Sequence, residues 1–387
     1  TFWSLGGNWR ISREAFMEDV EWVKNLSLKV SYGEQGNDNI GSLYAWQSLY
    51  DLSWANASQI GGMVSSLENK NVSWEKNGNF NVGVEASLFD DFINLSVEYF
   101  NRKTKNMLLS YPMATSTGFN GYNANVGDMR NSGVEAEIKI SPIRTNDVKW
   151  NITLMGSHVK NKVLKLTGET HSTKEGSPIN TFYMAKSAGV DPATGAQLYW
   201  VYDKDEHGNI VNERISSDYT KAANSKYYQG NRIPDLYGSI ATDLSWKGFD
   251  LNILTTYSIG GKVFDGLYQG SMNNMYYNAN WNKHALRRWQ KPGDVTDVPR
   301  IEVGGKSTTT NRFLVDASYF SIKNITLGYT LPKAWMNKVK LNSVRIFTSV
   351  DNLALFTHLD GMDPQYNFSG QTDYAYSPNK TWSVGFD

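Results

Sequence analysis

The chain has 387 residues, which is enough for two average soluble domains or for one large β-barrel. Lys plus Arg and Asp plus Glu both number 38, so the formal net charge is zero, which argues against a nucleic-acid-binding protein because such proteins normally carry a basic patch. The absence of cysteine excludes disulfides and thiolate metal sites.

No apolar run approaches the roughly 18 residues that a membrane helix needs, whereas a transmembrane β-strand needs only about 10 residues of alternating polarity. The aromatic content of 13% and the 33 glycines favour a β-rich chain with many turns. The composition therefore leaves two all-β classes open, a soluble β-protein and a transmembrane antiparallel β-barrel.

The chain is predicted to begin with a strand over 1–12, and the acidic segment 13–25 is expected to form a helical turn. Alternating apolar residues mark the next strand: Leu26, Leu28, Val30 and Tyr32. Residues 33–71 are interpreted as a long excursion, within which 44–52 is expected to pair.

The clearest pattern lies in residues 79–100, where two runs of alternating apolar and polar residues are separated by Asp90 and Asp91. Successive side chains of a strand point to opposite faces, so each run has one apolar and one polar face. Glu85 and Glu98 both fall on the polar face. The short acidic connection predicts an antiparallel hairpin.

Farther along, the same pattern predicts strands at 134–140, 148–154, 236–246, 249–259, 319–331, 341–350 and 381–386. The connections alternate between short and long. The short ones are 90–91, 141–147, 247–248 and 332–340, and the long ones are the segment after Phe100 and those at 159–235, 260–318 and 351–379. Within the third long segment, residues 280–290 are compatible with a helix.

This alternation of connection length favours an outer-membrane barrel, in which short turns lie on the periplasmic side and long loops on the extracellular side. A soluble sandwich has no reason to sort its loops in this way. Aromatic residues near strand ends fit an interfacial girdle, with core filling as the alternative: Tyr99, Trp150, Trp246, Tyr257 and Tyr329. About 11 strands are too few for loops of this size. We therefore expect the chain to be the C-terminal part of a larger barrel.

Several motifs resemble those of SusC/RagA-like TonB-dependent outer-membrane transporters. DASYFSIKNITLGYTLPK (316–333) is similar to a hallmark near the C-terminus of that family, and VRIFTSVDNLALFTHLDGMDPQ (344–365) resembles the block that follows. NVSWEKNGNFNVGVE (71–85), NVGDMRNSGVEAEI (125–138) and RRWQKPGD (287–294), followed by Pro299 and Arg300, match further family patterns. The final TWSVGF (381–386) resembles the closing strand, and a few residues are expected to follow it. The resemblance covers essentially the whole chain.

The resemblance implies a transmembrane antiparallel β-barrel of which residues 1–387 form about half of 22 strands, located in the bacterial outer membrane. It also implies a plug domain and a TonB box, neither of which lies in this chain. The implied partners are a SusD-like surface lipoprotein, the TonB complex that energises transport, and a second copy in a homodimer of transporter–lipoprotein pairs. The implied function is oligosaccharide import. A peptide importer of the same family, a passive porin or structural barrel, and a soluble carbohydrate-binding protein remain alternatives.

The chain offers no credible catalytic constellation, and we expect neither an enzyme nor a bound cofactor. Glu85, Glu98, Glu135 and Glu137 are interpreted as carboxylates that line a water-filled lumen, although paired carboxylates also serve glycoside hydrolysis. Asp203, Asp205 and His207 imitate the start of a calcium-binding loop, but Arg214 occupies the position where a glutamate belongs. A tight turn is the preferred interpretation, and no metal site is predicted.

The most suggestive functional feature is the aromatic content of the predicted extracellular segments. The candidate ligand-binding residues are Tyr227, Tyr228, Tyr276, Tyr277, Trp281 and Trp289. Flat aromatic faces with a polar edge suit capture of a glycan or a peptide, and packing of the long loops is the alternative role. If 280–290 is helical, Trp281 and Trp289 lie about 80° apart on the helix and share one face.

Overall fold

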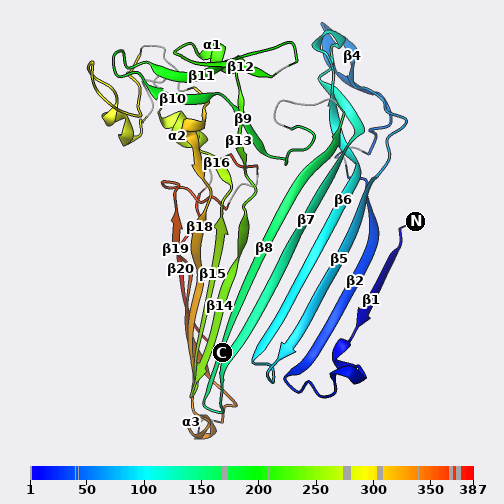
Figure 1. Ribbon diagram of the computed structural model, residues 1–387, viewed down its shortest axis with the longest axis vertical. Coiled ribbons are helices and arrows are strands. Elements are labelled where there is room, and N and C mark those ends of the chain that lie inside the picture. The colour runs from blue at the N-terminus through cyan, green and yellow to red at the C-terminus, as the bar shows by residue number, and fades with distance from the viewer. Residues whose placement is uncertain are drawn as a thin grey trace.

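The computed structural model describes the whole chain except residues 1, 40, 42, 168–172, 208, 273–279, 303–307, 339, 366–368 and 372–375. An 11-stranded antiparallel sheet dominates it, in the order β1-β2-β5-β6-β7-β8-β14-β15-β18-β19-β20 (Figure 1). Its strands are Ser4–Trp9 (β1), Val23–Asn37 (β2), Glu75–Leu88 (β5), Ile93–Pro112 (β6), Gly121–Arg144 (β7), Val148–Leu166 (β8), Leu236–Trp246 (β14), Phe249–Ile259 (β15), Tyr319–Thr330 (β18), Arg345–Thr357 (β19) and Thr381–Phe386 (β20). The all-β class and the expected number of sheet strands are confirmed. Strands β1 and β20 are the two edges of an open sheet.

One face of this sheet is apolar along its whole width. Residues opposite each other on neighbouring strands point to the same face, and Val84 pairs with Leu28, with Val97 and, through Val97, with Ala136. Large apolar side chains on this face are exposed, among them Val84, Val134, Ile240, Leu327, Ile346, Phe356 and Val384. An exposed apolar surface of this extent is typical of a barrel wall that faces lipid.

Aromatic side chains border the apolar face at both ends. At the end with the tight turns, Trp246, Phe249 and Tyr329 occupy one register row, with the Phe249 and Tyr329 rings 4.4 Å apart. At the other end, Tyr32 pairs with Phe80, and Tyr99 lies one row below. Tyr329 is half-buried, and the other five rings are exposed, which is inconsistent with core filling and fits an interfacial belt.

Tight hairpins join the strands at one end of the sheet, as the sequence predicts. Phe89, Asp90 and Asp91 all have positive φ between β5 and β6, and Lys247 and Gly248 do so between β14 and β15. A β-carbon on Gly248 would lie 2.9 Å from the Thr330 carbonyl oxygen, so this turn requires glycine. The helical turn expected in 13–25 is present as the 3₁₀ helices Ile11–Arg13 and Ala15–Met17, and a short helix, α3 (Lys333–Lys338), lies between β18 and β19.

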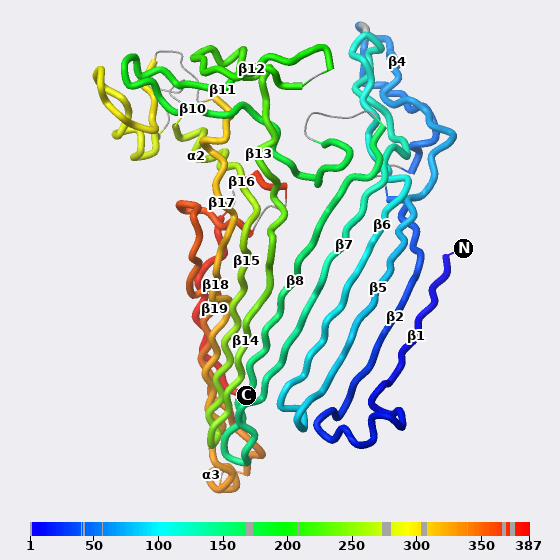
Figure 2. The backbone as a smooth tube through the Cα atoms, in the orientation of Figure 1, coloured from blue at the N-terminus to red at the C-terminus, as the bar shows by residue number. Residues whose placement is uncertain are grey.

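The predicted loop after Phe100 is wrong, because β6 and β7 continue to pair far beyond the apolar band. They end at Pro112 and Gly121 and form an outer ribbon with bulges after Thr104 and Asp128 (Figure 2). This ribbon lacks alternation of polarity because neither of its faces meets lipid. The pairing expected at 44–52 occurs instead in the hairpin of β3 (Leu49–Asn56) and β4 (Gln59–Ser66).

A second group of small elements lies above β14–β19 (Figure 1), and we call it the cap. Its elements are β9 (Thr181–Met184), β10 (Lys186–Val190), β11 (Gln197–Lys204), β12 (Ile210–Ser216), α1 (Tyr219–Asn224), β13 (Tyr227–Asn231), β16 (Lys262–Phe264), α2 (Gly266–Ser271), the 3₁₀ helices Lys283–Arg287 and Asn311–Phe313, and β17 (Leu314–Asp316). None of the helices in the described part of the chain is long and apolar enough to cross a membrane.

The clusters of buried apolar residues lie in the cap and at its base, whereas the sheet buries individual apolar residues such as Phe100 and Val163. Three clusters of buried residues are present: Ala185, Tyr199, Val201 and Ala222; Met184, Phe264 and Phe313; and Val263, Ala317 and Leu359. The Phe313 side chain is only 1% exposed. These long segments are therefore folded units with their own apolar interiors.

Candidate functional site

The four predicted carboxylates, Glu85, Glu98, Glu135 and Glu137, lie on the polar face of the sheet. Glu98 stands directly opposite Glu135, and Glu85 and Glu137 occupy the next register row, so all four project to the same side. Lys29 forms an ion pair with Glu85. Two carboxylates placed directly opposite each other repel, so this arrangement needs water or a further cation nearby. The geometry agrees with the prediction of a hydrated lumen, and the role of these residues remains a prediction.

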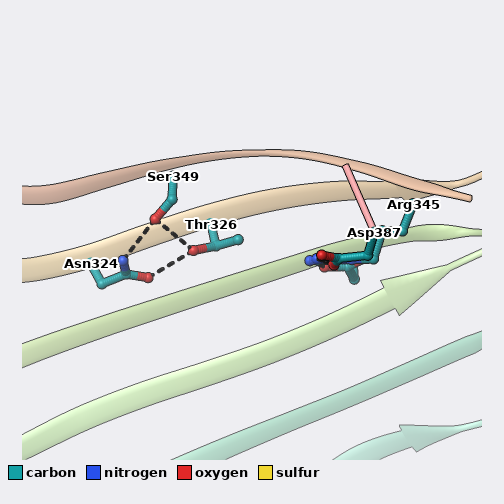
Figure 3. A network of polar contacts seen from close by, with 6 residues as sticks. Asn324, Thr326, Arg345, Ser349 and Asp387 are labelled. Carbon is teal, nitrogen blue, oxygen red and sulfur yellow. Dashed lines mark hydrogen bonds and ion pairs between the residues drawn. The ribbon is translucent and has the colours of Figure 1, made fainter. Parts of the chain in front are cut away.

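A network of polar side chains continues this face across β18 and β19 (Figure 3). The Asn324 amide donates to Ser349 Oγ at 2.9 Å and to Asp351 Oδ1 at 2.7 Å. The Thr326 hydroxyl donates to Asn324 Oδ1 at 2.9 Å and lies within hydrogen-bond distance of the Ser349 hydroxyl, at 3.0 Å. These bonds fix the polar side chains in one arrangement and satisfy their donors without bulk water.

Near the tight turns, Arg345 forms a bidentate ion pair with Asp250 on the same polar face. Arg345 donates to both oxygens of Asp250, from Nε at 2.9 Å and from Nη2 at 2.6 Å, and Asp387 lies 3.4 Å from its Nη1 (Figure 3). A β-carbon on Gly328 would lie 2.5 Å from Arg345 Nη2, so the glycine makes room for the pair. The two parallel hydrogen bonds fix the relative orientation of the Arg345 and Asp250 side chains, which a single contact would not do.

In the cap, the structure places Tyr227 and Tyr228 on β13. The Tyr227 hydroxyl donates to Glu213 Oε1 at 2.8 Å, and its ring meets Tyr202 edge-on at 4.8 Å. Burial raises the pKa of Tyr227, as does the Glu213 carboxylate beside it. Tyr228 is 45% exposed, and its ring lies 4.7 Å from that of Tyr183. Tyr227 is thus engaged within the cap, whereas Tyr228 presents an accessible ring.

Trp281 and Trp289 do not form the helical platform that their spacing suggested. The only helical residues between them are the 3₁₀ helix Lys283–Arg287. Trp289 donates from Nε1 to the Pro192 carbonyl oxygen at 2.9 Å, and its ring covers Gly195 so closely that a β-carbon there would lie 2.4 Å away. Trp289 therefore joins two cap segments. Tyr276 and Tyr277 lie outside the described residues.

Trp281 is 37% exposed and lines a pocket of about 180 Å³ between β11 and the segment that follows α2. At its wall, the Tyr199 hydroxyl lies 2.8 Å from Thr308 Oγ1. Burial raises the pKa of Tyr199, which keeps this hydroxyl neutral. The pocket combines one flat indole, hydroxyl groups and charged side chains, which is the mixture that orients a polar ligand.

Three arginines line this pocket, and sequence reasoning did not single them out as site residues. Arg300 is paired with Glu302 and also donates to the Thr194 carbonyl oxygen at 2.6 Å. Burial lowers the pKa of Arg312, whose guanidinium lies over the Phe313 ring at 5.2 Å. Arg288 completes the set. The only sequence signal for Arg288 and Arg300 is the RRWQKPGD block with Pro299 and Arg300, which by itself does not indicate a pocket, and Arg312 lies outside that block.

The segment resembling a calcium loop is a turn held by its own side chains. Asp205 Oδ1 accepts hydrogen bonds from the backbone N–H groups of His207 at 2.9 Å and Asn209 at 2.8 Å. Asp203 pairs with Arg214. Within the described ranges, no three His, Cys, Asp or Glu side chains gather as metal ligands would.

Comparison with known families places these features in context. Residues 1–353 match the sequence model of the family described as TonB dependent receptor-like, beta-barrel. The TonB-dependent receptor P3 of Formosa agariphila is 28% identical over 98% of this chain and 41% of its own length. The TonB-dependent receptor SusC of Bacteroides thetaiotaomicron is 25% identical over 100% of this chain and 39% of its own length.

Solved structures give the same result. The structure of the RagAB peptide transporter matches 100% of this chain and 43% of the matched chain, with a TM-score of 0.87 and 28% sequence identity. The closed state of the RagAB peptide importer gives a TM-score of 0.88 at the same identity. This chain spans less than half the length of the relatives it matches.

Proposed function

The chain belongs to the TonB-dependent receptor β-barrel family, in its SusC/RagA-like branch in the bacterial outer membrane, and we propose that it forms the C-terminal part of a barrel that imports oligosaccharides. The observation that carries the proposal is that Trp281, whose side chain is partly exposed, lines a polar pocket of the cap above a sheet whose inner face is polar. Stacking of an indole on a sugar ring with hydroxyl groups nearby is a suitable way to capture a glycan.

The proposal includes the partners that a SusC-like transporter requires. A SusD-like surface lipoprotein would cover the extracellular opening, and the TonB complex would supply energy through a plug domain and TonB box. Two transporter–lipoprotein pairs would form the homodimer. No catalytic step belongs to the proposal, since the matched relatives are receptors and transporters.

Peptide import is the second candidate function, and two observations favour it. The RagAB structures that match this chain are described as peptide transporters. The arginines around the cap pocket, Arg288, Arg300 and Arg312, also suit the carboxylates of an acidic or C-terminal peptide residue. Capture of a neutral glycan should depend weakly on salt, whereas capture of a charged peptide should weaken as salt rises.

The test uses the full-length transporter with its lipoprotein and compares Trp281→Ala with Trp289→Ala. Trp281→Ala should leave outer-membrane abundance unchanged and weaken binding by more than about 1 kcal/mol, as expected for an interface anchor. Trp289→Ala should reduce abundance, because it removes the contact that joins two cap segments. Binding and uptake are measured for neutral oligosaccharides and for peptides at low and high salt.

The outcomes separate the candidate roles. Loss of oligosaccharide binding in Trp281→Ala supports the proposal, and loss of peptide binding alone selects the second candidate. If Trp281→Ala keeps normal abundance, binding and uptake for both ligand classes, the pocket has no role in capture.

A further inference from the structure

A cluster of cations lies on the outward, lipid-facing side of the sheet just above its apolar band. On β5 the outward positions run upward from Val84 and Val82 through Phe80 to Gly78 and Lys76. The neighbouring strands change in the same way, from apolar to basic, within two or three outward positions. The outward cations are Lys76 on β5, Lys103 and Lys105 on β6, Arg130 on β7, and Lys160 and Lys162 on β8.

The pairing register brings these cations together across four strands. Lys76 stands opposite Lys105, Lys103 opposite Arg130, and Arg130 opposite Lys162. Residues opposite each other share a face, so the like charges are direct neighbours and repel one another. A stable arrangement of this kind needs an anion.

The protein supplies one outward carboxylate at this place, Glu34, which stands opposite Gly78. No ion pair to Lys76, Lys103, Lys105 or Arg130 occurs within the described part of the chain. Glu34 accepts a hydrogen bond from the Tyr32 hydroxyl at 3.3 Å, Glu75 accepts the Leu108 N–H at 2.8 Å, and Asp128 accepts the Asn106 N–H at 3.1 Å. One carboxylate does not balance the outward cations, so an excess of positive charge is left for solvent or headgroups to neutralise.

The same place on the wall is hollowed. The residues that line a depression of about 520 Å³ include Tyr32, Phe80, Lys76, Lys103, Lys105 and Arg130, with Glu34 as its one carboxylate. It exists partly because Gly78 has no side chain: the Tyr32 hydroxyl lies only 3.1 Å from where a β-carbon would stand. Two aromatic rings thus form the lower edge of the depression, and four cations surround its upper part.

The height of the cluster matches the membrane surface. Lys103 and Arg130 share the row of Gly78, two residues beyond Phe80, which is about 7 Å along a strand. The polar interface of a bilayer extends about 5–8 Å beyond each side of its hydrocarbon core. The long connections lie at this end of the sheet, so this interface belongs to the extracellular leaflet.

The cluster lies on strands that extend beyond the apolar band. By register, Phe320 and Phe356 share the row of Ala136, and Leu236 and Ile259 lie one outward position higher, level with Val134. Arg130 lies two outward positions above Val134, where β14 and β15 have already ended. The cations are therefore carried by a local upward extension of the wall.

We infer that this cluster binds a phosphate-bearing lipid of the outer leaflet. Phosphate oxygens would accept hydrogen bonds from the lysine ammonium groups and the Arg130 guanidinium, while the acyl chains lie along the apolar wall beneath. A soluble substrate does not fit the site, because it faces away from the interior of the barrel. An acidic protein partner would also neutralise the charges, but it would not explain why the cluster lies directly above the lipid-facing wall.

The test uses the full-length transporter in nanodiscs with diphosphorylated lipid A as the probe. The wild type should retain this lipid and should bind dephosphorylated lipid A, or phosphatidylcholine, at least tenfold more weakly. Lys103→Gln/Arg130→Gln should reduce retention of the phosphorylated lipid by about tenfold or more. The matched control is Lys139→Gln/Lys149→Gln, which removes the same charge from the polar face of the same sheet and should have no effect.

Other arms of the experiment identify the occupant. Millimolar inorganic phosphate should not displace the lipid, and displacement would show a site for a free anion, which overturns the inference. Equal retention of phosphorylated and dephosphorylated lipid A would also overturn it. So would a cluster variant that retains lipid but loses a co-purifying protein. Thermal unfolding of each variant is measured alongside, and Lys103→Arg should restore binding in a correctly folded barrel.

Discussion

The sheet and the cap organise apolar residues in opposite ways. In the sheet, the large apolar side chains are on the outer surface, as with Val84 and Leu327, and the polar network of Asn324 and Ser349 lies inside. In the cap, Phe313 and Val201 are almost fully buried, together with a few polar side chains such as Thr310 and Asp265. The comparison shows that one chain is adapted to two solvents, with lipid around the sheet and water around the cap.

The largest effect is expected when residues 1–387 are produced without the rest of the barrel. Residues 1–387 alone, refolded with lipid vesicles, should not give a closed pore. Strands β1 and β20 would expose unpaired backbone groups to hydrocarbon, at a cost of several kcal/mol for each group. Heat resistance on gels and conductance in planar bilayers are the measurements. A heat-resistant, conducting species would refute the proposal that these residues form part of a larger barrel.

A phenylalanine truncation in each region sharpens the contrast. Phe313→Ala in the cap should destabilise it by about 3–5 kcal/mol, because it leaves a cavity against Phe264 and Tyr268. The matched control is Phe320→Ala on the outer face, where the ring is 38% exposed and lipid fills the space, so its effect should be much smaller. Hydrogen exchange in cap and strand amides measures both. Equal protection loss in the two variants would contradict the assigned environments.

A charge placed on the apolar face of the sheet tests whether that face meets lipid. Val97→Arg, near the middle of the apolar band, should cost about 2–4 kcal/mol of folding free energy in lipid. Ser96→Arg places the same residue on the polar face between Glu85 and Glu137 and should be tolerated. The free energy of unfolding from vesicles is measured in denaturant. A cost near zero for both Val97→Arg and Val84→Arg would place this face outside the bilayer.

The smallest expected effect is a pH dependence confined to the cap. Burial raises the pKa of Tyr202 to about 12 and also raises the pKa of Tyr227. Both values exceed the pKa of about 10 in an unfolded chain, so their contribution to stability is complete below pH 10 and is lost as the pH rises through the folded values. As the pH rises from about 10 to 12, backbone amides of the cap should therefore lose protection from hydrogen exchange at a lower pH than backbone amides of the sheet.

The control for this pH dependence is a pair of tyrosine variants. Tyr202→Phe should lose about 1 kcal/mol at neutral pH, since its hydroxyl donates to the Lys226 carbonyl oxygen at 2.7 Å, and should flatten the alkaline transition. Tyr50→Phe, on the exposed β3 hairpin, should change neither quantity. An unchanged alkaline transition in Tyr202→Phe would remove tyrosine ionisation as its cause.

The sheet could be predicted from the sequence because the alternation of apolar and polar residues within a strand is a local pattern. Alternation with period two in 79–100 and 236–259 identified the correct hairpins, and Lys247 and Gly248 form the expected turn. Strand β19 begins at Arg345 and runs to Thr357, farther along than the predicted 341–350. The outer ribbon of β6 and β7 was missed because pairing in water needs no lipid-facing alternation. Wherever a strand leaves the membrane, the pattern used to find it disappears.

The cap could not be predicted in the same way, because its contacts join residues far apart in the sequence. Trp289 is positioned by Pro192 and Gly195, and Tyr199 meets Thr308 across more than a hundred residues. No periodic pattern encodes such pairs. The four predicted carboxylates fall together because a hairpin register follows from alternation. The aromatic candidates that the structure describes lie on two separate segments, β13 and the segment after α2.

The bulges after Thr104 and Asp128 bear on how this wall can change through evolution. Below them, one inserted residue in β6 or β7 would exchange the lipid-facing and inward-facing sides of every residue beyond it. A bulge accommodates one extra residue locally and so confines the shift. Natural variation can therefore lengthen or shorten the outer ribbon freely. Related chains should keep a constant residue count below these two positions and vary in length above them.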